Sequence, residues 1–155
     1  MKVNAPTAYE KLIREAINRF PPWILSAAHV RDISVAGGEY MRQVLAMYEH
    51  GSRSIKVYSG LPRDLLVQAI GHEIMHAVDD NFDHPHIFSS QPNWLQLHRD
   101  RGYFTISKYR EEPLEFFADI ASKYFLLGRN RLQITHPEEV HFLETVVFPV
   151  LRENF

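Results

Sequence analysis

Cysteine is absent from the 155 residues of this chain, which excludes both disulfide bonds and thiolate-bound metals. Long apolar runs are lacking too, and none approaches the 18 or so residues that a membrane-spanning helix needs. Neither sign of charge dominates, because 17 Lys and Arg residues stand against 19 Asp and Glu residues, a formal net charge of −2. We therefore expect neither a nucleic acid nor a membrane as a partner.

The composition that remains is typical of a globular protein, with 45% hydrophobic and 23% charged residues. The length predicts a single domain, residues 1–155, large enough to bury a core. Met1 to Pro6 lack the apolar core of a secretory signal. We accordingly expect a cytoplasmic protein as the chain stands, or a secreted one if a signal has been removed, and we expect it to be a monomer.

The most informative segment is His72-Glu73-Ile74-Met75-His76. On a helix, residues four apart lie on one face, so the two imidazoles can meet one metal ion at roughly 2.0–2.1 Å. Glu73 then lies where its carboxylate can take a proton from a water at that metal. Pro62 and the helix-forming residues after it favour a helix through the motif, ending near Asp79. Gly71 interrupts the helix formers, which indicates close packing at that point.

A hydrolytic zinc site needs three protein ligands and an open fourth position, so a third ligand must follow His76. A second helix is predicted from Pro113, with Gly128 just past its end. Glu115 in its first turn is the predicted ligand, because a carboxylate among buried phenylalanines needs a partner. Asp119, one turn later, is predicted to accept the ring N–H of His72 or His76.

The rest of the chain predicts an α+β fold. Two capping boxes, Thr7 to Glu10 and Thr135 to Glu138, predict the starts of an N-terminal and a C-terminal helix, the latter bent or ended by Pro149. Pro21 and Pro22 are predicted to stop the N-terminal helix. Strands are predicted at 31–36, 43–48 and 54–58. Trp94 is predicted to be a core or lid residue, in a loop-rich stretch over 82–108.

Two stretches, His-Glu-Ile-Met-His-Ala-Val-Asp-Asp at 72–80 and Glu-Phe-Phe-Ala-Asp at 115–119, resemble the catalytic domain of anthrax lethal factor and the related Pro-Pro endopeptidases. The resemblance implies a zincin-like fold of the gluzincin type. It has an N-terminal helix, a small twisted sheet, the active-site helix and a helical C-terminal part. It implies that His72, His76 and Glu115 bind Zn²⁺ and that Glu73 is the general base. It further implies an oxyanion-stabilising tyrosine, Tyr109, with Tyr103 as the alternative.

Together these features predict a zinc-dependent endopeptidase that hydrolyses a peptide or protein substrate through a metal-activated water. Two other functions stay open. A regulatory metallopeptidase of the ImmA/IrrE type has a similar helix and later glutamate, and cleaves one specific protein. A non-catalytic interaction module could keep zinc only to stabilise its fold, although Glu73 argues against that, because a structural site has no use for a base.

Overall fold

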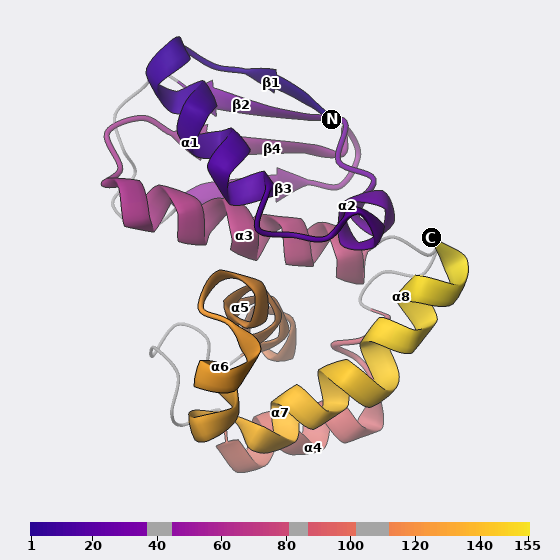
Figure 1. The fold of residues 1–155 in the computed structure, drawn as a ribbon. Helices are drawn as coiled ribbons and strands as arrows, with labels where there is room; N and C mark the ends of the chain where they lie inside the picture. The colour runs from indigo at the N-terminus through magenta and orange to yellow at the C-terminus, as the bar shows by residue number, and fades with distance from the viewer. Residues whose placement is uncertain (37–44, 81–86, 102–111) are drawn as a thin grey trace.

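The computed structural model describes residues 1–36, 45–80, 87–101 and 112–155. A four-stranded sheet with the order β1-β2-β4-β3 lies in the N-terminal half (Figure 1). The strands are β1 (Lys2–Asn4), β2 (Asp32–Ala36), β3 (Ala46–Glu49) and β4 (Ser54–Tyr58). β1, β2 and β4 are parallel, whereas β3 runs antiparallel to β4 and forms one edge of the sheet. The α+β class is therefore confirmed.

Helices account for most of the rest of the described chain. They are α1 (Thr7–Ile17), α2 (Pro22–Ala28), α3 (Arg63–Asp79), α4 (Pro92–Arg101), α5 (Pro113–Leu126), α6 (Arg129–Thr135), α7 (Pro137–Phe142), a π-helical segment η3 (Leu143–Val147) and α8 (Phe148–Asn154). None of the helices in these residues combines the length and the apolar character needed to cross a membrane.

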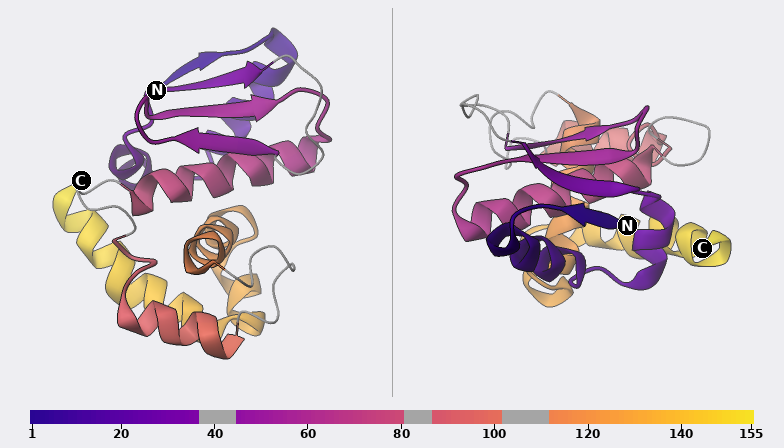
Figure 2. Two further views of the ribbon diagram at one scale, coloured as in Figure 1. Left: turned by 180° about the vertical axis from the view of Figure 1, so that it is seen from behind. Right: turned by 90° about the horizontal axis from the view of Figure 1, so that it is seen from above.

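The molecule has two layers that meet at α3. The sheet, α1 and α3 form the upper part of Figure 1, and α4 to α8 form the lower part, with α5 against α3; Figure 2 shows the same division from behind. Among the residues of β2 and β4, Ile33, Ile55 and Val57, are fully buried, as expected for strands with one face on the core. α3 therefore connects the sheet to the helical part.

The predicted strands at 31–36 and 54–58 correspond to β2 and β4, and the described part of the third corresponds to β3. α1 ends at Ile17, before it reaches Pro21-Pro22, and Pro22 begins α2, a helix that the sequence did not predict. Proline suits this position because the first helical N–H has no partner within the helix. β1 and α4 were also missed, the first because it has only three residues.

Helices do begin at both predicted positions, but the two predicted capping boxes were wrong. α1 begins at Thr7 with Pro6 as the N-cap, and α7 begins at Pro137 with His136 as the N-cap, and neither has a side-chain capping bond. Glu10 instead binds Arg14 one turn later, at 2.8 Å. Each proline sits immediately before or at the first helical residue, where its fixed φ favours helix initiation without a capping side chain.

The C-terminal helix does not end at Pro149, because α8 continues to Asn154. A proline ring inside an α-helix would clash with the carbonyl four residues earlier, here that of Thr145. Thr145 lies in η3, the π-helical segment that ends one residue before α8 begins. The wider turn of the π-helical segment η3 accommodates the ring of Pro149. The helix therefore changes from π-helical to α-helical winding there and does not end.

Candidate metal centre

The candidate site lies on α3, which carries His72, Glu73 and His76 on two adjacent turns. Gly71 explains how α5 comes so close to α3. A Cβ at this position would lie 2.8 Å from Leu126 Cδ1 on α5 and 3.2 Å from Phe20 Cζ, both shorter than ordinary contacts. The close packing predicted from Gly71 is thus confirmed, and it lies at the last residue of α5, whereas Glu115 lies in the first turn of that helix.

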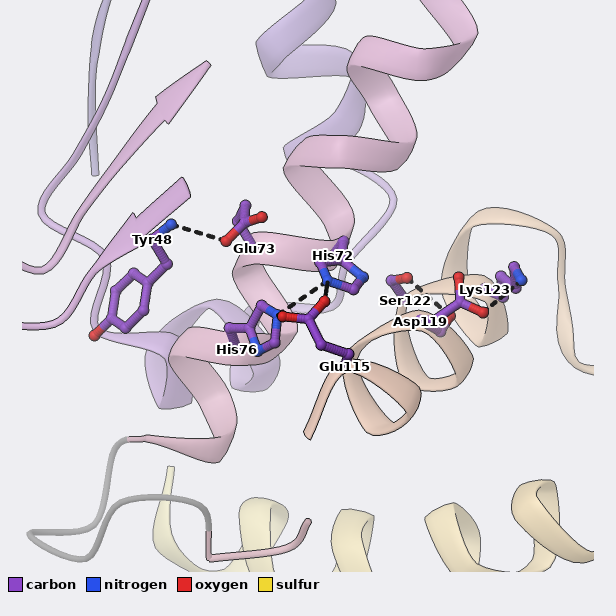
Figure 3. Close-up of polar contacts among 8 residues, drawn as sticks. All are labelled: Tyr48, His72, Glu73, His76, Glu115, Asp119, Ser122 and Lys123. Carbon is purple, nitrogen blue, oxygen red and sulfur yellow. Dashed lines mark hydrogen bonds and ion pairs between the residues drawn. The ribbon is translucent and has the colours of Figure 1, made fainter. Parts of the chain in front are cut away.

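Three donor groups converge between these helices. The ligand atoms of His72, His76 and Glu115 all lie within 4.8 Å of one another. His72 Nε2 is 3.0 Å from Glu115 Oε2 and 2.9 Å from His76 Nε2, and His76 Nε2 is 3.4 Å from Glu115 Oε1. Figure 3 shows the two rings and the carboxylate pointing toward one another. Two imidazoles and one carboxylate are a donor set that suits Zn²⁺ at a catalytic site.

The charges of these groups are coupled. Burial acts to lower the pKa of His76, but the Glu115, Glu73 and Asp79 carboxylates outweigh it and hold that pKa above its ordinary value. Burial acts to raise the pKa of Glu115, yet hydrogen bonds from His72 and His76 hold it far below the usual range. Glu115 is therefore ionised at neutral pH, as a metal ligand must be.

Glu73 lies beside this group but faces the sheet. Its Oε2 accepts a hydrogen bond of 2.8 Å from the backbone N–H of Tyr48, on the edge strand β3 (Figure 3). The half-buried ring of Tyr48 lies next to the end of α3, where burial and the Asp80 carboxylate raise the pKa of its phenol. Asp80 also pairs with His50 in the loop that follows β3.

Asp119 has a different partner from the one predicted. Lys123 Nζ lies 2.6 Å from its carboxylate, and Figure 3 draws that carboxylate pointing away from both imidazoles. Asp119 and Lys123 are four residues apart on α5, the spacing at which opposite charges meet on a helix. The predicted role of Asp119 in orienting a histidine ring is not what this geometry indicates.

Two neighbouring residues brace the site. Asp79 is buried at the end of α3, and its Oδ1 accepts the N–H groups of Phe88 and Ser89 at 2.7 and 3.0 Å. Trp94, fully buried, donates from Nε1 to the carbonyl of Pro113 at 2.9 Å, next to the first turn of α5. Trp94 is therefore a core residue that fixes the start of the helix carrying Glu115.

Both tyrosines predicted for the oxyanion, Tyr109 and Tyr103, lie outside the described residues. Sequence reasoning missed the contact between Glu73 and the backbone of Tyr48, as well as the pairing of His50 with Asp80. No sequence pattern could have identified the first contact, because a backbone N–H belongs to every residue except proline.

Models of known protein families and curated proteins were both compared with the chain, and no match was found in either comparison. The resemblance to the lethal-factor group therefore continues to depend on the two short motifs around His72 and Glu115 alone.

Proposed function

We propose that this protein is a zinc-dependent endopeptidase with a zincin-like fold. The observation that carries the proposal is the convergence of His72, His76 and Glu115, from two separate helices, with Glu73 one residue from the first ligand. A partly buried carboxylate and two partly buried imidazoles so close together are difficult to explain by packing alone, because apolar side chains would fill the space without the desolvation that charged groups incur.

In this proposal His72, His76 and Glu115 would hold a zinc ion. Bound there, the ion would supply a water of lowered pKa, about 7, and a Lewis acid for the scissile carbonyl. Glu73 takes the proton from the attacking water and passes it to the leaving amine. No covalent intermediate with the protein is required, so the chain needs no serine or cysteine nucleophile.

The substrate would be an extended peptide. β3 is a sheet edge adjacent to Glu73, and an extended chain can add to such an edge through those backbone groups that are not already bonded, which leaves out the Tyr48 N–H that donates to Glu73. A peptide bound in this way would lie alongside the metal ligands on α3, with its scissile bond near Glu73. Of the predicted strands, β3 is therefore the one proposed to bind substrate.

The test is a peptide-library cleavage screen with zinc-loaded protein, using Glu73→Gln as the inactive variant and the exposed Glu153→Gln as the matched control. We expect wild type and Glu153→Gln to cleave alike. Glu73→Gln should hold the same amount of zinc and lose about 10²–10⁴-fold in rate, the usual contribution of a general base. The glutamine is almost isosteric with glutamate but cannot accept the proton.

Three results would contradict the proposal or narrow it. Normal cleavage by Glu73→Gln would remove the base from the mechanism. Zinc binding with no cleavage of any peptide would favour the non-catalytic zinc module. Cleavage confined to one protein, with the library left intact, would favour the regulatory type of metallopeptidase.

A further inference from the structure

The outer edge of β3, the edge that does not pair with β4, faces the active-site helix α3. In an antiparallel pair, the N–H groups of one strand point alternately toward the partner strand and away from it. The N–H of Tyr58 donates to the carbonyl of Leu45 across the β3–β4 ladder, at 3.2 Å. Met47 lies opposite Lys56 and Tyr48 lies opposite Ile55. Counting alternately from Leu45, the N–H of Met47 points toward β4 and the N–H of Tyr48 points outward.

The outward N–H of Tyr48 meets the carboxylate of Glu73. The hydrogen bond measures 2.8 Å, joins residues 25 positions apart and is partly buried. A bond from a backbone amide to a charged acceptor is among the stronger kinds in proteins. Because β3 is fixed in the sheet, this bond also fixes one oxygen of Glu73 and leaves the second oxygen to act on water.

A second contact joins the residues just after the ends of β3 and α3. His50 lies two residues after Tyr48 and pairs through Nδ1 with Asp80 Oδ2. Asp80 follows the last residue of α3, seven positions after Glu73. At 1.5 Å per helical residue, seven positions span about 10 Å, so the two contacts hold the strand at well-separated points.

We propose that Tyr48 and the His50–Asp80 pair form a two-point clamp that positions Glu73. The clamp consists of the bond from the Tyr48 backbone to Glu73 and the bond from His50 to Asp80. Tyr48, His50 and Asp80 are positioning residues, which act on hydrolysis only through the placement of Glu73. The kinetic part of this inference depends on the proposed function, whereas the clamp itself can be measured without a substrate.

Amide hydrogen exchange, followed by NMR on the full-length zinc-loaded chain, tests the clamp directly. We expect the Tyr48 amide to exchange about tenfold faster in Glu73→Ala than in wild type, since a charged hydrogen-bond partner is lost. The Met47 amide, which faces β4, should exchange equally in both proteins. Equal exchange of the Tyr48 amide in wild type and Glu73→Ala would overturn the proposal.

His50 supplies the second test, because its side chain is 73% exposed and its removal should not disturb folding. His50→Ala should speed exchange of the Tyr48 amide and lower kcat several-fold, with KM and zinc content unchanged. His50→Gln, which can still donate to Asp80, should restore most of the slow exchange of the Tyr48 amide and most of the wild-type kcat. The exposed His141→Ala on α7 is the matched control and should behave as wild type.

The outcomes separate the two proposals. Loss of kcat in His50→Ala with no rescue by His50→Gln would contradict the positioning role, as would unchanged exchange of the Tyr48 amide in His50→Ala. If the wild-type protein cleaved no peptide, the proposed function would fail, and the exchange rates would still decide whether the clamp exists.

Discussion

His76 and Glu115 stabilise each other's charged forms when no cation lies between them. The raised pKa of His76 adds stability to the fold that is complete below pH 6.5, its ordinary value, and is lost as the pH rises through the folded value. The lowered pKa of Glu115 adds stability that is present above pH 4.5 and is lost as the pH falls through its folded value. Zinc requires neutral histidine, so protons and metal compete for the same ring.

The metal-free protein should therefore become less stable as the pH rises above 6.5, the ordinary pKa of histidine, and His76 loses its proton. Zinc affinity should change in the opposite sense and increase over the same range. Thermal denaturation of the chelated protein and zinc titration at several pH values measure both effects. Glu115→Gln is the control, because without the carboxylate the stability of the metal-free protein should depend less on pH. An identical pH dependence in wild type and Glu115→Gln would show that the pair is not coupled in solution.

Among the helices, α3 and α5 approach closely at Gly71, where Leu126, the last residue of α5, packs against α3. Gly71→Val should lower the stability by about 1–3 kcal/mol, the usual effect of overpacking, because the added atoms meet Leu126 and Phe20. It should also weaken zinc binding, since moving α5 moves Glu115. Urea denaturation and zinc titration measure the two effects.

Gly51→Val is the matched control for Gly71→Val. Gly51 lies in the loop between β3 and β4, and a Cβ there would meet no atom within 4 Å. This variant should keep both the stability and the zinc affinity of wild type. If Gly71→Val bound zinc as tightly as Gly51→Val, the position of α5 would not control the ligand set.

The sequence predicted the elements that have a strong local signal. β4, the bounds of α3 and α5, and the close packing at Gly71 all follow from residue patterns within a few positions. What it missed depends on contacts between distant residues or on very short elements. The three residues of β1 have too little pattern. The partner of Asp119 is a different case, because Lys123 lies only four residues away on the same helix and this local spacing could have predicted the ion pair.

Prediction of the site was uneven for the same reason. His72, His76 and Glu115 could be grouped in advance because a metal demands several ligands in one place, and the structure brings them together. The contact of Glu73 with Tyr48 could not be predicted from the sequence, because it depends on the register of β3 against β4 and on the direction of one backbone amide. Tyr109 and Tyr103 stay predictions.

The metal would join the two layers of the protein, because α3 belongs with the sheet and α5 with the helical part (Figure 1). Zinc at 100 times its dissociation constant should stabilise the fold by about 2.7 kcal/mol, which corresponds to a rise of roughly 5–10 °C in Tm for a chain of this size. A chelator should reverse the rise. His76→Ala should show no such rise, and an equal rise in that variant would indicate zinc bound elsewhere.

Anomalous diffraction at the zinc edge, from crystals of the zinc-loaded protein, tests the ligand set most directly. The proposal predicts one strong peak per chain, about 2.0–2.2 Å from one nitrogen of His72, one nitrogen of His76 and a carboxylate oxygen of Glu115. A peak held by the two histidines with Glu115 turned away and no third protein ligand, or no peak between α3 and α5, would contradict it.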